Sequence, residues 1–336
     1  MKVLLVKTSS LGDIVHAFPA VTDAARTIPG IRFEWLVEEA FVDAPSWHPA
    51  VDGVIPVALR RWRIKPGTAL REWPAFKRRV RAIEYDIVLD AQGLMKSAAL
   101  GLLARGLRCG PDHRSAREPV AAWAYRRRIA VPRERHAIDR LRALFAGALG
   151  YPTPTTEPDY GIVPPRSAAA DYVLLLPATS WSSKRWPDAH WAELAHLADR
   201  HGLEVRTPWR DDAQKAQAAR LIERCPKGRS VATPRLNDLA AVIGGARAVA
   251  AADTGAAHMA AAFGVPAVTI YGATSPSRTG TVGPSQIHLT ADFPCSPCGR
   301  RVCRYRGPAE VRPACYGTVS PARVWDSLAG LLGTPR

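Results

Sequence analysis

The sequence predicts an α/β protein made of two doubly wound domains, each a parallel sheet with helices on both faces. Short apolar runs alternate with helix-like segments along the first 150 residues, and the alternation resumes at residue 172. Five prolines lie between residues 150 and 166, where neither a helix interior nor a central strand would tolerate them. Such alternation indicates parallel sheets, and 336 residues suit two cores better than one.

The expected domain organisation follows from these breaks. We expect an N-terminal Rossmann-like domain over residues 1–155, a proline-rich linker over 156–170, a C-terminal Rossmann-like domain over 171–318 and a final segment over 319–336. Two domains joined in this way are expected to leave a cleft between them. In the final segment, Val324, Leu328 and Leu331 recur at helical spacing, which predicts a helix that packs on one of the domains.

The individual elements are predicted from apolar periodicity and from turn residues. In the first half we expect strands over residues 3–6, 32–37, 54–57 and 86–89, and helices over 13–27, 71–82 and from 97 onward. In the second half we expect strands over 172–176, 203–207, 230–232, 248–252 and 267–270, and helices over 188–200, 211–224, 237–244, 255–263 and 321–332.

Composition limits the functional classes. A hydrophobic content of 47% with 23% charged residues is typical of a soluble globular protein. The start of the chain lacks the pattern of a signal peptide, and no run is apolar enough for a membrane span, so we expect a cytoplasmic protein. The net charge of +16 is concentrated in two segments. Residues 60–81 contain nine basic residues and a single acid, Glu72, and residues 114–142 contain nine basic residues and three acids. Such clusters suggest an anionic partner, although a solvated helix face would look the same.

Residues 247–273 carry the most distinctive local pattern. A strand of small apolar residues ends at Asp253, Thr254 and Gly255, and a small-residue helix begins there. The first turn of such a helix directs free N–H groups and a positive dipole end toward an anion, and Gly255 has no Cβ to keep a phosphate away. Asp253 and Thr254 are also common helix caps, so the turn alone does not establish a site.

Two other polar loops each follow the first expected strand of a domain. The loop over residues 7–13 fits neither a dinucleotide fingerprint nor a P-loop, but its Asp13 suits a general base or, alternatively, a partner of the helix dipole. The loop over residues 177–187 offers Thr179, Ser180 and Lys184, whose donors and positive charge suit a diphosphate leaving group. A solvated loop is the alternative reading of that segment.

Four cysteines cluster near the C-terminus, at positions 295, 298, 303 and 315. Cys295, Cys298, Cys303 and Cys315 could hold a structural zinc ion, although their spacing is not that of two CxxC pairs. Reduced thiols and disulfides remain the alternatives. Cys109 and Cys225 are expected to be core residues.

Many motifs in one order resemble the lipopolysaccharide heptosyltransferase I family. They cover nearly the whole chain up to about residue 290, and they are, in order, the loop at 7–13, WLVEE at 35–39, PSWH at 45–48, VIPV at 54–57, RRWR at 60–63, DAQGL at 90–94, KRWP at 184–187, TPW at 207–209 and DTGAAH at 253–258. Arg210 and Gln214 depart from the expected glycine and acid, and the cysteine-bearing tail is a further departure.

The resemblance implies a GT-B glycosyltransferase that moves L-glycero-D-manno-heptose from ADP-heptose to Kdo of the lipopolysaccharide inner core. It implies inversion, no catalytic metal and no cofactor besides the ADP-heptose substrate, and a monomer at the cytoplasmic face of the inner membrane. By position, the catalytic residues would be Asp13 and Lys184; the donor site would hold Thr179, Ser180, Lys184, Asp253, Thr254, Gly255 and His258; the Kdo-lipid A acceptor would meet Ser10, Arg60, Arg61 and Arg63.

Two alternatives remain at this point. The same scaffold could transfer the second heptose or use a different nucleotide sugar. The charge could instead serve nucleic acid, but the chain lacks an RNA-binding or helix-turn-helix signature, and its basic residues concentrate in one half.

Overall fold

The structure is a computed structural model that describes residues 1–165 and 170–333. The chain forms two compact units, Met1–Val163 and a second that begins at Pro164. Part of the expected linker, residues 166–169, lies outside the described residues. Within the described ranges, no helix is both long enough and apolar enough to cross a bilayer.

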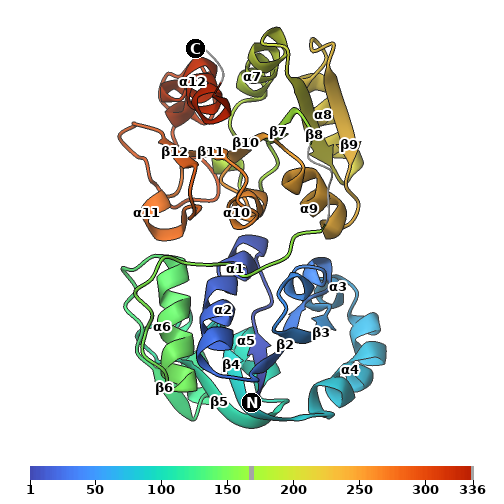
Figure 1. Cartoon of the computed structure of the whole chain (residues 1–336), viewed down its shortest axis with the longest axis vertical. Coiled ribbons are helices and arrows are strands. Elements are labelled where there is room, and N and C mark those ends of the chain that lie inside the picture. Colours follow the sequence, from blue (N-terminus) through green and yellow to red (C-terminus); the bar gives the residue numbers. More distant parts are fainter. Residues whose placement is uncertain (166–169, 334–336) are drawn as a thin grey trace. The chain divides into compact units, whose positions relative to one another are not determined.

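The first unit is a six-stranded sheet in which every paired neighbour is parallel (Figure 1). Its order is β3-β2-β1-β4-β5-β6. The strands are β1 (Lys2–Val6), β2 (Arg32–Glu38), β3 (Val51–Val57), β4 (Glu84–Asp90), β5 (Arg105–Pro111) and β6 (Arg127–Ile129). The helices are α1 (Leu11–Val15), α2 (Phe18–Thr27), α3 (Leu59–Ile64), α4 (Pro66–Arg81), α5 (Met95–Gly101) and α6 (Ala137–Leu149), with short 3₁₀ turns η1 (Glu39–Phe41), η2 (Pro45–Trp47) and η3 (Pro119–Ala124).

Successive side chains along each strand of this unit point to opposite faces of the sheet and pack into two separate cores. Leu4 and Val6 pack with Trp62 of α3 and Phe76 of α4 on one face. On the other face, Phe33 contacts Phe145 of α6, and α2 lies beside α6 (Figure 1). Because both faces are covered, the central strand β1 is buried from Val3 to Val6, as parallel strands between two helix layers generally are.

The second unit repeats this plan. Its order is β12-β11-β10-β7-β8-β9, again with parallel pairs. The strands are β7 (Tyr172–Leu176), β8 (Glu204–Trp209), β9 (Gly228–Ala232), β10 (Ala248–Ala252), β11 (Ala267–Tyr271) and β12 (Gln286–Thr290). The helices are α7 (Asp188–Arg200), α8 (Asp212–Leu221), α9 (Leu236–Gly244), α10 (Gly255–Ala262), α11 (Pro276–Thr279) and α12 (Pro321–Leu332), with η4 (Ser182–Lys184) and η5 (Ala314–Thr318).

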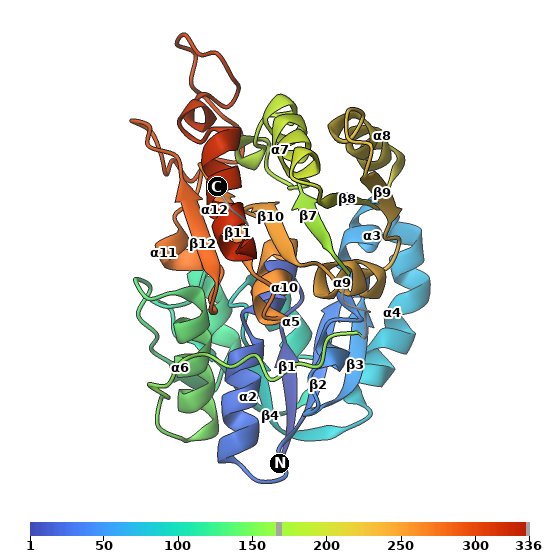
Figure 2. The same ribbon diagram turned by 45° about the horizontal axis from the view of Figure 1, so that its top comes forward.

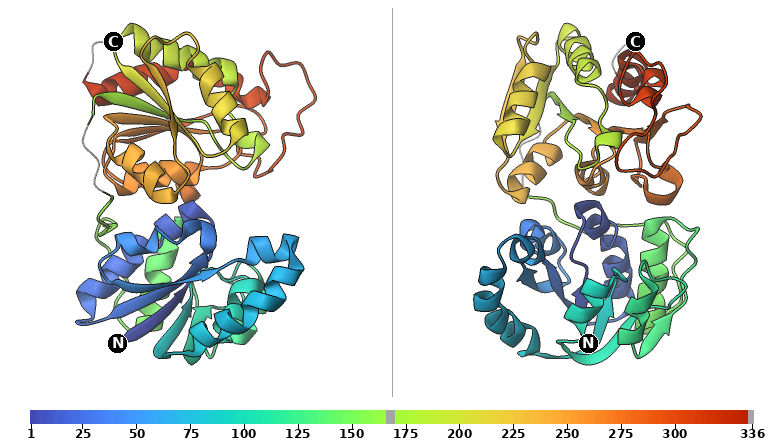
Figure 3. Two further views of the ribbon diagram at one scale, coloured as in Figure 1. Left: turned by 90° about the vertical axis from the view of Figure 1, so that its right-hand side faces the viewer. Right: turned by 180° about the vertical axis from the view of Figure 1, so that it is seen from behind.

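Large aromatic side chains close one face of the second sheet. Trp191 of α7 and Trp325 of α12 share a core with Val173 and Ile270 of the strands, and Trp186 meets Trp191 edge-on at 4.9 Å between ring centroids. The predicted last helix therefore packs on the second unit, where it contacts α7. After β12 the chain leaves the sheet as a long loop, which projects from this unit in Figures 2 and 3.

The predicted fold class is confirmed, with three corrections to its elements. The helix expected over residues 13–27 is two helices, because Pro19 occupies the first turn of α2 and cannot continue a helix from α1. Strands β5, β6 and β12 and helices α3, α6 and α11 had no sequence signal that we recognised. The helix expected over residues 71–82 begins earlier, at Pro66, whose fixed φ suits a first turn.

Candidate active site

Both sheets place their polar loops at the point where strand order reverses. In the first unit this point lies between β1 and β4, and in the second between β7 and β10. Ligands of doubly wound sheets bind at such switch points, beyond the carboxyl ends of the strands. The loops at residues 7–13 and 90–94 follow β1 and β4, and those at 177–187 and 253–255 follow β7 and β10. All four loops singled out by sequence or resemblance therefore lie at switch points.

Asp13 is held at the end of β1 by its own loop. Its Oδ2 accepts hydrogen bonds from the Ser10 backbone N–H at 2.9 Å and from the Ser10 hydroxyl at 2.7 Å. The Nζ of Lys7 lies 4.0 Å from Oδ1. Lys7 is buried and also donates to the Ala91 carbonyl at 2.9 Å, so its ammonium group is held near the carboxylate. Ser10 and Asp13, two of the predicted residues, are thus in direct contact.

The charge on Asp13 is strongly favoured. Burial opposes that charge, but Lys7 and the two Ser10 hydrogen bonds outweigh it and lower the pKa of Asp13 to about 2. Burial in turn lowers the pKa of Lys7, and the Asp13 charge opposes this effect. With 38% of its side chain exposed, Asp13 is a carboxylate that is ionised at neutral pH and accessible to a ligand.

A second layer fixes the loop that carries Lys7. Gln92, which follows β4, accepts hydrogen bonds at 2.8 Å from both the backbone N–H and the hydroxyl of Thr8. Asp90 accepts from the Gln92 N–H at 2.8 Å and from the Tyr125 hydroxyl at 2.6 Å. We had not predicted these residues as part of the site. The signal for Asp90 and Gln92 was their position at the end of β4, the neighbour of β1.

The three arginines of α3 differ in what they can offer a ligand. Arg61 forms ion pairs with Glu39 at 2.9 Å and with Glu72 at 2.8 Å. Its guanidinium is therefore occupied by carboxylates of its own unit. Arg60 lies over the ring of Phe41, and both Arg60 and Arg63 are exposed. Of the predicted acceptor residues on α3, Arg60 and Arg63 present the more available charge.

In the second unit, Lys184 and Asp253 form a close pair. Lys184 Nζ lies 2.5 Å from Asp253 Oδ2, and the two side chains are 15% and 6% exposed. The Thr274 hydroxyl also donates to the same oxygen of Asp253. Thr179, from the loop after β7, donates to the Asp253 carbonyl at 3.4 Å. The loops after β7 and β10 therefore converge, as predicted from their place in the sheet.

The remaining predicted donor residues lie in the loop after β7 and in the first turns of α10. Thr254 and Gly255 stand where α10 begins, with Thr254 as its N-cap residue. Ser180 is exposed. His258 lies one turn into α10 and is buried. At the end of β8, Gln214 accepts from the Arg210 N–H at 3.1 Å, which closes that turn locally.

Three further residues contribute to this end of the sheet and had not been predicted. Thr274 lies in the loop after β11 and donates to Asp253; its signal was a polar residue shortly after a strand. Trp181 lies under Lys184, with Nζ 4.6 Å from the ring centroid, and Arg301 lies 5.6 Å from the same ring. Arg301 comes from the loop after β12, so no pattern in the sequence places it here.

The four C-terminal cysteines all line one cavity of about 380 Å³ in the loop after β12. They are free thiols. Burial and the neighbouring thiols raise the pKa of Cys315 to about 11. Across residues 1–165 and 170–333, no three His, Cys, Asp or Glu side chains are arranged to hold a metal ion. Zinc binding by this cluster stays a prediction.

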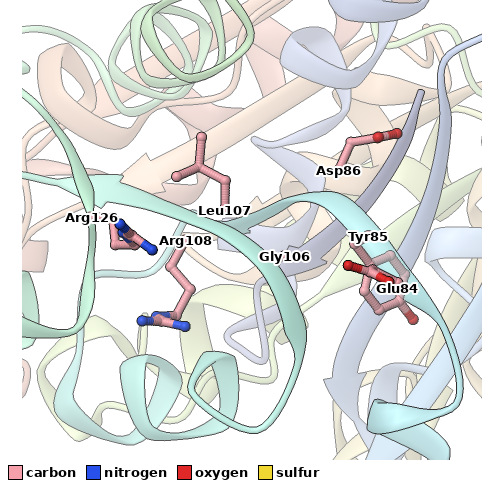
Figure 4. Close-up of a pocket in the computed structure, with 7 residues that line it drawn as sticks. All are labelled: Glu84, Tyr85, Asp86, Gly106, Leu107, Arg108 and Arg126. Atoms are coloured by element: carbon pink, nitrogen blue, oxygen red, sulfur yellow. The ribbon is translucent and has the colours of Figure 1, made fainter.

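A further cavity of about 540 Å³ lies away from all of these loops. Its lining comes from the first residues of β4 and β5 and from Arg126, so it opens at the amino ends of the strands (Figure 4). Arg108 in this lining is already bound to the Ala124 carbonyl at 3.0 Å. Because ligands of parallel sheets bind at the opposite edge, we do not assign the active site to this cavity.

Two Rossmann-like units in one chain, each with charged loops at its switch point, are the architecture of the GT-B glycosyltransferases, and the protein is an enzyme of this class. The model of glycosyltransferase family 9 (heptosyltransferase) matches residues 73–308. The chain belongs to that family, which confirms the resemblance drawn from its motifs.

Individual relatives agree with this assignment. The chain is 46% identical over 351 residues to lipopolysaccharide heptosyltransferase 1 of Pseudomonas aeruginosa, covering 100% of this chain and 99% of the relative. It is 43% identical to the Escherichia coli K12 enzyme of the same name, covering 85% and 92%. The structure of E. coli heptosyltransferase WaaC with ADP-2-deoxy-2-fluoro heptose superposes with a TM-score of 0.82 at 39% identity, covering 97% and 98%.

Proposed function

We propose that this enzyme transfers L-glycero-D-manno-heptose from ADP-heptose to a Kdo residue of lipopolysaccharide inner core, with inversion and without a catalytic metal. The similarity to heptosyltransferase 1 and to a structure that holds an ADP-heptose analogue supports the choice of donor and acceptor. The acceptor domain would be residues 1–155 and the donor domain residues 171–318. The enzyme would act as a monomer, peripheral to the cytoplasmic face of the inner membrane.

The observation that carries the chemical proposal is the partly exposed, ionised Asp13 beside a buried lysine. A hydroxyl of Kdo attacks the anomeric carbon of heptose, and Asp13 takes the hydroxyl proton. The new bond forms from the acceptor oxygen to that carbon while the bond to the ADP oxygen breaks. Attack opposite the leaving group inverts the anomeric centre. A positioned base of this kind contributes about 10² to 10⁴ in rate.

The leaving diphosphate would be received by the second unit. As its bond to the sugar breaks, negative charge grows on the ADP oxygen, and Lys184 with the N–H groups at the start of α10 would stabilise that charge. Thr179, Ser180, Asp253 and His258 would bind phosphate and sugar. Ser10, Arg60, Arg61 and Arg63 would meet the acidic acceptor, and Arg61 would do so while paired with Glu39 and Glu72.

The test is a donor and acceptor matrix with purified enzyme. We expect transfer from ADP-heptose to Kdo-lipid A, little transfer from UDP-sugars or GDP-sugars, and undiminished activity in EDTA. An acceptor that already carries one heptose should be a poor substrate. Preferential use of that heptosylated acceptor would identify an enzyme that adds the second heptose, and NMR of the product would report whether the anomeric centre is inverted.

A further inference from the structure

The exposed face of α3 and α4 combines aliphatic and basic side chains. Ile64, the last residue of α3, is 74% exposed, and Leu70 of α4 is 80% exposed. Trp73 is 39% exposed and is held in place by the rings of Trp62 and Phe76. Figure 1 shows the two helices as neighbours at one side of the first unit. Large apolar side chains this exposed on two contacting helices can mark an interaction surface.

The basic residues extend this apolar face along α4. Positions 70, 73, 74, 77, 78 and 81 share one side of a helix by their spacing. Its first half is therefore Leu70 and Trp73, and its second half carries Lys77, Arg78 and Arg81. The one acid of α4, Glu72, is bound by Arg61 and by the Trp62 indole N–H at 2.7 Å, and Arg61 and Trp62 lower its pKa to about 2.

Arg71 is exposed and lies two turns before Arg78, at the border of the same side of α4. We propose that the exposed face of α3 and α4, formed by Ile64, Leu70, Trp73, Arg71 and Arg78, docks the enzyme onto an anionic lipid bilayer. Aliphatic and tryptophan side chains enter the boundary between headgroups and acyl chains, while arginines pair with anionic headgroups. A nucleic acid would match the charge, but its phosphodiester backbone offers nothing to Ile64 and Leu70.

The position of this face suits the proposed reaction, on which the inference rests. The α3 helix begins directly after β3, at the same carboxyl edge of the sheet that carries Asp13. The Arg60 backbone N–H is tied to that edge by Glu38, the last residue of β2, at 2.9 Å. A bilayer against α3 and α4 would therefore bring a lipid-linked acceptor to the edge where the proposed base lies.

The test measures co-sedimentation of the intact enzyme with vesicles that contain no lipopolysaccharide. We expect binding to vesicles of phosphatidylglycerol mixed with phosphatidylcholine, and little binding to phosphatidylcholine alone. The Ile64→Ser/Leu70→Ser variant should bind the anionic vesicles about tenfold more weakly or worse. The matched control is Val302→Ser, which removes an exposed aliphatic side chain of the second unit and should bind like the wild type.

Charge is tested separately. Arg71→Gln/Arg78→Gln should weaken binding at low salt and flatten its salt dependence, because each arginine contributes to the electrostatic attraction. Arg224→Gln/Arg229→Gln lowers the net charge equally through two exposed arginines of the second unit and should have little effect. Equal losses in both variants would show attraction by net charge rather than by this face, and would overturn the proposal.

A water-soluble, deacylated Kdo acceptor separates this inference from the proposed function. Ile64→Ser/Leu70→Ser should keep the wild-type kcat on that acceptor while losing activity on Kdo-lipid A embedded in vesicles. If the wild type fails on both acceptors, the proposed function is wrong, and the vesicle result still decides the docking face. Wild-type vesicle binding by Ile64→Ser/Leu70→Ser, or its loss in Val120→Ser/Trp123→Ser of η3 instead, would refute the assignment to α3 and α4.

Discussion

Replacing Asp13 by asparagine removes the proposed base while leaving the shape of its loop. The amide oxygen of asparagine can still accept the two hydrogen bonds that Ser10 donates to the carboxylate. Lys7 keeps its hydrogen bond to the Ala91 carbonyl. The Asp13→Asn substitution therefore removes a negative charge and a proton acceptor, and little else.

The structure separates the expected loss of activity from the expected loss of stability. Holding the pKa of Asp13 near 2 instead of its ordinary 3.8 favours the charged form by roughly 2 kcal/mol, and the 38% exposure of the side chain reduces this to about 1 kcal/mol. Because this pKa is depressed by folding, the contribution is present above about pH 4 and is lost as the pH falls toward 2. Losing the base should raise the activation barrier by about 3 to 5 kcal/mol.

The assay is steady-state transfer at saturating ADP-heptose, together with ADP affinity by calorimetry and a thermal melt. We expect kcat to fall by about 10² to 10⁴, ADP affinity to stay the same, and the melting temperature to fall by about 2 to 4 °C. Wild-type activity should also show no loss from Asp13 protonation above about pH 4. A kcat within threefold of the wild type would mean that Asp13 only orders its loop.

Three further substitutions test the rest of the structure. Lys184→Met should weaken ADP binding by about 10- to 100-fold, since a charged hydrogen bond is lost and the buried Asp253 carboxylate is left unneutralised. In calorimetry, Lys184→Met/Asp253→Asn should recover part of the lost ADP affinity. Unchanged ADP affinity in the single variant would remove Lys184 from the donor site. His48 is buried, and burial lowers its pKa to about 4. The free energy of unfolding, measured in denaturant, should therefore fall by about 3 kcal/mol as the pH drops from 6.5 to 4. His48→Gln should flatten that pH dependence. Arg142→Met should destabilise the first unit by about 3 to 5 kcal/mol, because the paired side chains of Arg142 and Asp23 are only 4% and 9% exposed. Recovered stability in Arg142→Met/Asp23→Asn would confirm the uncompensated Asp23 charge as the cause. A single variant as stable as the wild type would contradict this prediction.

Elements with strong local signals could be predicted from the sequence almost to the residue. The strand Ala248–Ala252 and the helices Asp188–Arg200 and Pro321–Leu332 have the predicted bounds. Each is an apolar run or a periodic stretch that begins or ends at a proline, a polar turn or a glycine. The strand Arg105–Pro111 escaped notice because glycines and arginines interrupt it. It is a strand because β4 and β6 pair with it on both sides, which is tertiary information.

The site could be predicted in outline but not in its contacts. Rules about parallel sheets placed Thr179 and Asp253 at one edge, and the two residues do meet there. Several contacts of the site come from elsewhere in the chain. Thr274, in the loop after β11, contacts Asp253, and Arg301, in the loop after β12, lies over Trp181. Arg61 forms ion pairs with Glu39 and Glu72. Such pairings depend on the three-dimensional arrangement of loops, for which local sequence gives no signal.

Each unit sets a lysine against an aspartate at its switch point, and the exposure of the two partners is reversed. In the first unit the lysine is the more buried partner, at 8% against 38% for Asp13, so a ligand meets a carboxylate. In the second unit the aspartate is the more buried, at 6% against 15% for Lys184, so a ligand meets an ammonium group. A proton must be taken from the acceptor, and negative charge must be received from the donor. The reversed burial of the two pairs therefore supports the proposed roles, base catalysis in the first unit and binding of a departing diphosphate in the second.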